Sequence, residues 1–257
     1  MQNDTPPASR HLKNAPIQEA VLHIRSGLDR TDPTNGRAVP YRPSVEEIEK
    51  RGFKFERYIS LQEQFPPFVA VPKENNPVVG YRFSTEDKKW VLQWFKDGGV
   101  SLSQLAPYDS WERFVDYARP FFELAIAENE LSETRSIGLR YINRFPISSP
   151  DELFKKYFRS RGDDPGIEGC VRKEFVSMSK FQLPDANTSL TVSRNLLEQI
   201  QNGRHALFAI LDIDVIATPR GVSSWTDVWS VANRLRDLKN RVFFSQFTSK
   251  GLEAFNE

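Results

Sequence analysis

Apolar and polar side chains alternate in several short segments of the first half of the chain. Residues 17–27, IQEAVLHIRSG, place Ala20, Leu22 and Ile24 on one face, which is the period-two pattern of a half-buried strand. Segments 78–87, 89–97 and 99–105 also have strand character, and the turn-prone sequences EDKK and DGG separate them. The first half is therefore predicted to form a largely antiparallel sheet.

Two helices are predicted in the same half. Ser44 precedes VEEIEK, with Glu47 at capping-box spacing, and we expect this helical region to run towards EQFPP with a break near Gly52. The clearest helix opens at Trp111, because its apolar residues recur at helical spacing. These residues are Trp111, Phe114, Val115, Ala118, Phe121, Phe122, Ala125 and Ile126. Pro120 is expected to kink this helix because its ring removes a backbone donor.

The second half repeats this order of elements. SIGLRYINRF at 136–145 predicts a strand, and Ser149, Pro150 and Glu152 supply the N-cap, the helix-opening proline and the capping-box acid of a helix. Three more strands are predicted within 170–183, 189–195 and 206–217. A last helix opens at SSWTDVW, and the apolar face predicted for this helix carries Val228, Ala232, Leu235, Leu238 and Val242. A further turn is predicted in the tail.

The matching order predicts an α+β fold with an internally duplicated β-α-β-β-β-α unit. Setting Leu22 against Leu139 gives an offset of 117 residues (139 − 22), and setting Trp111 against Trp225 gives 114 (225 − 111). We expect residues 1–14 to be a flexible lead-in, 15–132 the first half and 133–257 the second. Since one sheet with one long helix would expose a sheet face, both halves are expected to pack as one unit under two long amphipathic helices.

The amino-acid composition reduces the classes of molecule that the chain is expected to bind. The chain has 35 basic and 34 acidic side chains, so its net charge gives no support for general binding to nucleic acid or to a membrane surface. A single cysteine excludes an intramolecular disulfide and a multi-cysteine zinc site, and three scattered histidines form no motif. No signal-peptide pattern and no membrane span is predicted, which makes the cytoplasm the simplest compartment.

The stretch LFAILDIDVIA raises the question of a metal site, because Asp212 and Asp214 end an apolar strand. The pattern resembles that of haloacid-dehalogenase-like phosphatases and of the diguanylate-cyclase-like palm. The glycine-containing continuation that follows this motif in the phosphatases is missing here. The second acidic turn that the cyclase-like palm requires is missing as well. A structural interpretation is favoured, in which the two acids share the second face of a central strand and need cationic or donor partners.

Such partners occur in GLRYINRF, where Arg140 and Arg144 share one face of the strand. If the two strands are neighbours, these arginines could meet Asp212 and Asp214, either as ion pairs that fix the strand register or as a patch that holds an anionic ligand or a partner. Asn143 is a weaker candidate, since its amide can cap a local backbone group.

Other candidate sites are weaker. His23 is a strand residue for which a catalytic role is an alternative to a half-exposed polar position. Lys88, Lys89 and Lys96 lie close to Trp90 and Trp94, which keeps a single-strand nucleic-acid platform as an alternative to a buried aromatic core. No P-loop, dinucleotide fingerprint or catalytic triad spacing is present, and no cofactor or metal is predicted.

Several fragments together resemble a known family. They are HLKNAPIQEAVLHIR, YDSWERFVDYA, SIGLRYINRF, LDID and LRDLKNRVFFSQFTSKGLEAF, and the resemblance extends from about His11 to the C-terminus. The family is a sporadically distributed group of uncharacterised prokaryotic proteins of similar length. It implies no activity, cofactor or catalytic residue, and its scattered occurrence is compatible with carriage on mobile or defence-associated DNA.

The sequence favours a non-enzymatic cytoplasmic binding or regulatory protein. Its ligand or protein partner and its oligomeric state are not indicated, and Arg140, Arg144, Asp212 and Asp214 are the best polar candidates. The alternatives are a metal-dependent nuclease or phosphotransferase that uses Asp212 and Asp214, and a structural subunit of a protein complex. A large exposed apolar patch would favour the last of these.

Overall fold

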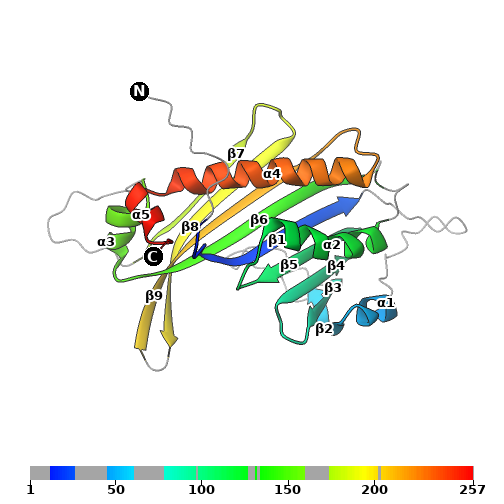
Figure 1. The fold of residues 1–257 in the computed structure, drawn as a ribbon, viewed down its shortest axis with the longest axis horizontal. Coiled ribbons are helices and arrows are strands. Elements are labelled where there is room, and N and C mark those ends of the chain that lie inside the picture. Colours follow the sequence, from blue (N-terminus) through cyan, green and yellow to red (C-terminus); the bar gives the residue numbers. More distant parts are fainter. Residues whose placement is uncertain are drawn as a thin grey trace, which may run out of the picture. The chain divides into compact units, whose positions relative to one another are not determined.

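The computed structural model describes residues 12–26, 45–60, 78–96, 98–126, 131, 134–159, 174–201 and 204–256. These residues form a mostly antiparallel α+β fold (Figure 1). The predicted fold class is thereby confirmed at this level. The helices in these ranges include none that is both long and apolar enough to cross a membrane. The chain divides into two compact units, which are described one at a time.

Unit 2 comprises Ala20–Gly138 and Thr218–Val231. Its strands follow the order β2-β3-β4-β5-β1, and the pairs β2–β3, β3–β4 and β4–β5 are antiparallel. The strands are β1 (Ile17–Ser26, mostly in this unit), β2 (Phe53–Ser60), β3 (Val78–Thr85), β4 (Trp90–Phe95) and β5 (Gly99–Leu105). The helices are α1 (Val45–Lys50) and α2 (Trp111–Ala125).

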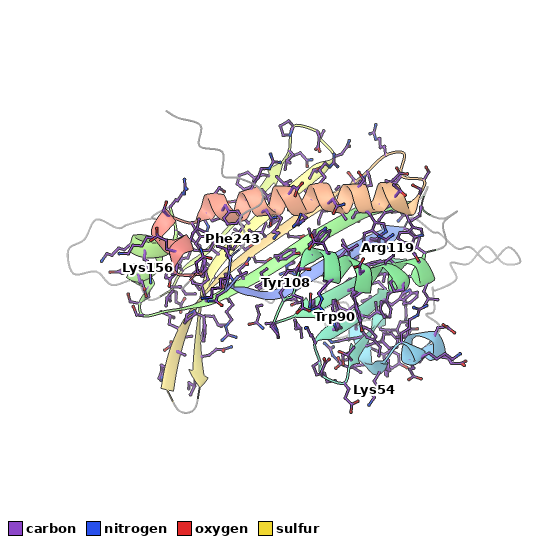
Figure 2. The ribbon with its side chains drawn as sticks, viewed as in Figure 1. Lys54, Trp90, Tyr108, Arg119, Lys156 and Phe243 are labelled. Carbon is purple, nitrogen blue, oxygen red and sulfur yellow. The ribbon has the colours of Figure 1, made fainter. Side chains whose placement is uncertain are left out.

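Helix α2 covers one face of this sheet through a stack of aromatic rings. Trp90 on β4 is labelled in Figure 2. Its ring centroid lies 4.0 Å from that of Tyr117 and 5.8 Å from that of Phe114. The helix begins where the Ser110 side chain accepts a hydrogen bond from the Arg113 N–H, as an N-cap residue does. The predicted apolar stripe of α2 is buried except for Val115, which is half-buried.

The break predicted near Gly52 is confirmed, but the predicted continuation of the helix is wrong for residues 53–60. Gly52 adopts a φ of +84°, a conformation that ends the helix and suits glycine, and the chain then forms strand β2. Phe53, Phe55 and Ile59 are strand residues whose alternation predicts a strand rather than a continued helix. The Ser44 cap and the EQFPP segment lie outside the described residues.

Unit 1 comprises Met1–Glu19, Leu139–Ala217 and Ala232–Glu257. Its strands follow the order β6-β9-β8-β7, with antiparallel β7–β8 and β8–β9 pairs. The strands are β6 (Thr134–Ile147), β7 (Val176–Gln182), β8 (Thr188–Gln201) and β9 (Arg204–Ala217). The helices are α3 (Pro150–Glu152), the π-helical turn η4 (Leu153–Tyr157), α4 (Trp225–Gln246, which begins in unit 2) and α5 (Ser249–Glu253).

Helix α4 lies against one side of the strands of unit 1 (Figure 1). Val228, Ala232 and Leu235 are fully buried as predicted. The rest of the predicted face is wrong, because Leu238 and Val242 are only half-buried, while Lys239 and Phe243 are buried instead. A period of 3.6 residues requires steps of both three and four, and after Leu235 the helix takes two successive steps of four.

An aromatic cluster closes unit 1 at the end of α4. Its members are Phe145, Tyr157, Phe158, Phe243, Phe247 and Phe255, whose ring centroids lie 4.8 to 6.5 Å from their neighbours. Phe243 on α4 is labelled in Figure 2. Thr248 caps α5 by accepting from the Gly251 N–H, and the Asn14 N–H donates to the Phe255 carbonyl at 2.8 Å. The aromatic cluster thus joins segments that are far apart in the sequence.

Candidate functional site

The predicted polar candidates belong to two faces of the sheet in unit 1. On β6, Leu139, Tyr141, Asn143 and Phe145 are buried, while Arg140 is exposed and Arg144 is half-buried. On β9, Leu211, Ile213 and Val215 are buried, and Asp212 and Asp214 point to the opposite face. The face that carries the arginines and the aspartates is called the open face below.

Strand register places the side chains of the open face in rows across β7, β8 and β9. The rows are Val176–Asn195–Ile210, Met178–Ser193–Asp212, Lys180–Thr191–Asp214 and Gln182–Ser189–Ile216. Every residue of these rows is half-buried or exposed, and none is fully buried. The open face therefore combines charged, hydroxyl and apolar side chains that remain accessible to solvent.

Arg140 and Asp212 form the main ion pair of the open face. Nε of Arg140 donates to Oδ1 of Asp212 at 2.9 Å, and Nη2 donates to Oδ2 at 2.6 Å. This bidentate geometry engages both carboxylate oxygens and raises the pKa of Arg140, chiefly through the hydrogen bonds to Asp212. The ion pair links β6 to its neighbour β9, as one of the two sequence-based interpretations anticipated.

Asp214 makes no direct hydrogen bond or ion pair within the described ranges. Its pKa is raised from 3.8 to about 6, chiefly by burial and also by the charge of Asp212, while the charges of Arg140 and Lys180 oppose the increase. A carboxyl group in this environment carries a proton during part of its time near pH 6. Asp214 is therefore the acid on the open face whose hydrogen-bonding capacity is least used by its own chain.

The predicted pairing of Arg144 with an aspartate does not form. Its Nη2 instead donates to Oε1 of Gln199 at 2.6 Å, and its guanidinium carbon lies 3.8 Å from the centroid of the Phe208 ring. The two arginines are four residues apart on β6, whereas the two aspartates are two residues apart on β9. At about 3.3 Å per residue these spacings differ by roughly 7 Å, so both arginines cannot face both acids.

Asn143 and His23 do not join these residues. Asn143 is buried on the face opposite to the arginines. Its Nδ2 donates to the local Tyr141 carbonyl at 3.4 Å, as predicted, and at 3.0 Å to the Leu211 carbonyl, which is distant in the sequence. His23 belongs to unit 2, where its ring makes an edge contact with Phe95 at 6.1 Å between centroids.

The basic and aromatic segment of unit 2 does not form a stacking platform. Trp90 and Trp94 are buried, so their rings cannot stack on bases. Lys88 donates to Glu56 at 2.5 Å, and Lys89 donates to Asp109 at 3.0 Å. The segment is thus part of the packed core and of its flanking ion pairs.

Lys239 is a charged residue that the sequence reasoning missed. It lies on α4 with 7% of its surface exposed, and its Nζ is 3.7 Å from the centroid of the Tyr141 ring on β6. Burial, with a smaller contribution from the charge of Arg236, lowers the pKa of Lys239 from 10.5 to about 7. The signal in the sequence was its position four residues after Leu235 on the buried stripe.

The chemistry available at Asp212 and Asp214 does not favour a metal centre. Both oxygens of Asp212 already accept from Arg140, and the raised pKa of Asp214 makes it a weaker ligand at neutral pH. Across the described ranges, no three histidine, cysteine or acidic side chains cluster in a way that could hold a metal ion. A scan of protein-family models and a search of curated proteins find no match to this chain.

Proposed function

We propose that this chain is a non-enzymatic binding protein that recognises a protein partner through the open face. One observation carries this proposal. The open face contains an acid, Asp214, without a direct partner in the described residues, beside exposed apolar side chains such as Met178, whose exposed fraction is 59%. An acid without a direct partner, beside accessible apolar side chains, offers both a polar contact and apolar contact area, and protein interfaces combine the two in a polar rim around an apolar core.

The charges of the open face support binding over catalysis. Arg140 neutralises Asp212, and Arg144 contacts Gln199 and Phe208, so each arginine already has partners in its own chain. A general acid or base needs a reacting group held beside it, and a metal-dependent phosphotransferase needs two carboxylates free to bind the ion. These contacts therefore favour a recognition surface on a stabilised sheet over acid–base catalysis and over metal-dependent phosphoryl transfer.

A structural subunit of a protein complex is a second candidate. Val176, Met178 and Phe181 on β7, together with Ile200 on β8, are exposed by 50% to 78%. Ile200 lies where β8 and β9 extend beyond the end of β7, since β7 pairs with β8 only as far as Asn195 (Figure 1). Val176 and Met178 share the open face, whereas the register places Phe181 and Ile200 on the opposite face, so it is the pair on β7 that favours a stable partner at the open face.

The proposal can be tested with a photo-crosslinking amino acid in place of Met178, expressed in cells of the native host. We expect one discrete protein adduct from this position and none from Arg241, an exposed residue of α4. Thr191→Trp, which fills the middle of the open face, should weaken binding of the purified adduct partner at least tenfold, whereas Arg241→Trp should not. Nucleotide or nucleic-acid turnover by the purified protein with Mg²⁺, abolished by Asp214→Asn, would instead establish the enzyme alternative.

We also infer that the two halves arose by duplication and that the family resemblance reflects common descent. The first strand of each half lies beside the last strand of its meander, because β1 neighbours β5 and β6 neighbours β9. A long helix follows the meander in both halves. Within the residues that the structure describes, the first half contains one strand more, β2, which is consistent with an addition to a shared plan.

A further inference from the structure

Strand β7 ends the strand order of unit 1, and its outer edge is unpaired in the described part of the chain. Six of its seven residues are exposed, with Val176 at 78% and Phe181 at 50%. Its pairing with β8 runs through seven consecutive residues without a bulge. A regular edge strand of this kind presents a row of backbone donors and acceptors to a further strand.

The edge strand of unit 2 differs in the features that prevent such pairing. β2 carries Lys54, Glu56 and Arg57, and a register irregularity lies between Phe55 and Arg57. Charges and bulges of this type are the usual means by which sheet edges avoid unwanted partners. β7 has one charge, Lys180, and neither a proline nor an irregularity. One edge of the chain is thus protected, and the other is suited to accept a strand.

The side chains of β7 also indicate what the added strand should carry. On the open-face side the edge presents Val176, Met178 and Lys180 in succession. Lys180 is exposed and has no ion pair within the described ranges. A strand that runs antiparallel to β7 would place an acidic residue opposite Lys180 and apolar residues opposite Met178 and Val176, because cross-strand neighbours of opposite charge attract.

We propose that β7 binds an extended segment of a partner protein as an additional antiparallel strand, with the pattern acidic, any residue, apolar, any residue, apolar. This inference rests on the proposed function, because it names the kind of partner segment that would extend the open face at its β7 edge. Backbone hydrogen bonds along the edge provide affinity, and Lys180 with Met178 and Val176 provides selectivity. The added strand would continue the row that contains Lys180, Thr191 and Asp214.

The test compares two labelled peptides by fluorescence anisotropy with the full-length chain. The acidic probe is TVETITVT and the basic probe is TVKTITVT, both acetylated, amidated and carrying the same solubilising tail. We expect wild type to prefer the acidic probe by roughly 5- to 20-fold, from the difference between attractive and repulsive cross-strand charges. Lys180→Glu should reverse this preference, whereas Lys250→Glu, at an exposed lysine of α5, should leave it unchanged.

The remaining outcomes separate the competing explanations. Equal binding of both probes, or a preference that Lys180→Glu leaves unchanged, overturns the strand proposal; if the Met178 adduct still forms, the proposed function survives. Loss of the adduct as well removes both. Self-association of wild type in analytical ultracentrifugation would identify a second copy as the occupant and overturn the proposal. Self-association only after Lys180→Glu, without peptide selectivity, would show that Lys180 merely protects the edge.

Discussion

Replacing Lys239 with methionine should stabilise the protein near neutral pH. Lys239 is buried beneath α4 against the Tyr141 ring and has no carboxylate partner within the described ranges. Lowering its pKa from 10.5 to about 7 corresponds to roughly 5 kcal/mol of unfavourable free energy for the charged form. At pH 7, where about half of the folded chain has released this proton, a cost of roughly 4 kcal/mol should remain.

The same residue predicts a specific pH dependence. The unfolded chain keeps the Lys239 proton up to about pH 10.5, while the folded chain releases it near pH 7. Between these values the unfolded state binds more protons, so the contribution of Lys239 makes stability rise with pH. Below about pH 7 the cost is fully present and constant, and above about pH 10.5 it is absent. Methionine has similar length and carries no charge, so the variant should lack this dependence.

Urea unfolding of wild type and Lys239→Met at several pH values from 7 to 10 measures the effect. The variant should be more stable by roughly 4 kcal/mol at pH 7, and the difference should shrink steadily towards pH 10. Lys250→Met is the control, because Lys250 is exposed and its replacement should change stability by only a few tenths of a kcal/mol. If Lys239→Met is no more stable than wild type at pH 7, the buried amine is better solvated than its surroundings imply.

Three further predictions concern the ionised groups of each unit. A double-mutant cycle of Arg140→Ala and Asp212→Ala should give a coupling free energy of about 1 kcal/mol in urea unfolding, because the bidentate pair is strong but the Arg140 side chain is 48% exposed; a coupling near zero would contradict the cross-strand role. Asp214 has a pKa raised to about 6, so its contribution to stability falls as pH rises from about 4 to 6. The free energy of unfolding of Asp214→Asn minus that of wild type should therefore be larger at pH 7 than at pH 4 by roughly 1–3 kcal/mol. Stability curves of the two proteins that run parallel between these pH values would refute this. Glu56 accepts hydrogen bonds from Lys88, Ser84 and Arg82, which lowers its pKa to about 2. Its stabilisation of the fold is present above about pH 4.5 and is lost as pH falls towards 2. Glu56→Gln should therefore lower the Tm at pH 7 in calorimetry and should reduce the further loss of Tm between pH 4.5 and 2.

Much of the fold follows from local patterns, but the exceptions have physical causes. The strands of the second half are recognisable because alternation separates a buried face from an exposed one, as Leu211 and Asp212 do on β9. β2 was missed because a capping signature directed the interpretation of the whole following segment. The break near Gly52, whose positive φ ends α1 after six residues, was predicted, but the residues after it were interpreted as further helix.

The candidate site was predicted in part. The contact between Arg140 and Asp212 follows from two strands with charges on matching faces, but which strands neighbour each other depends on long-range packing that sequence periodicity does not encode. The mismatch of Arg144 could have been foreseen from spacing alone. The exposure of β7 could not, because VSMSKFQ has the composition of an ordinary strand and only the strand order places it at an edge.

The aromatic cluster at the end of α4 has a consequence for biosynthesis. Phe247 and Phe255 contact Phe145, which precedes them by about a hundred residues in the chain, so the rings cannot assemble until residue 255 has left the ribosome. Until then the nascent polypeptide would expose the apolar side chains of the incomplete aromatic cluster to chaperones and proteases. Shortened translation products ending before Phe247 should consequently be cleared rapidly, even though they encode every strand of the sheet.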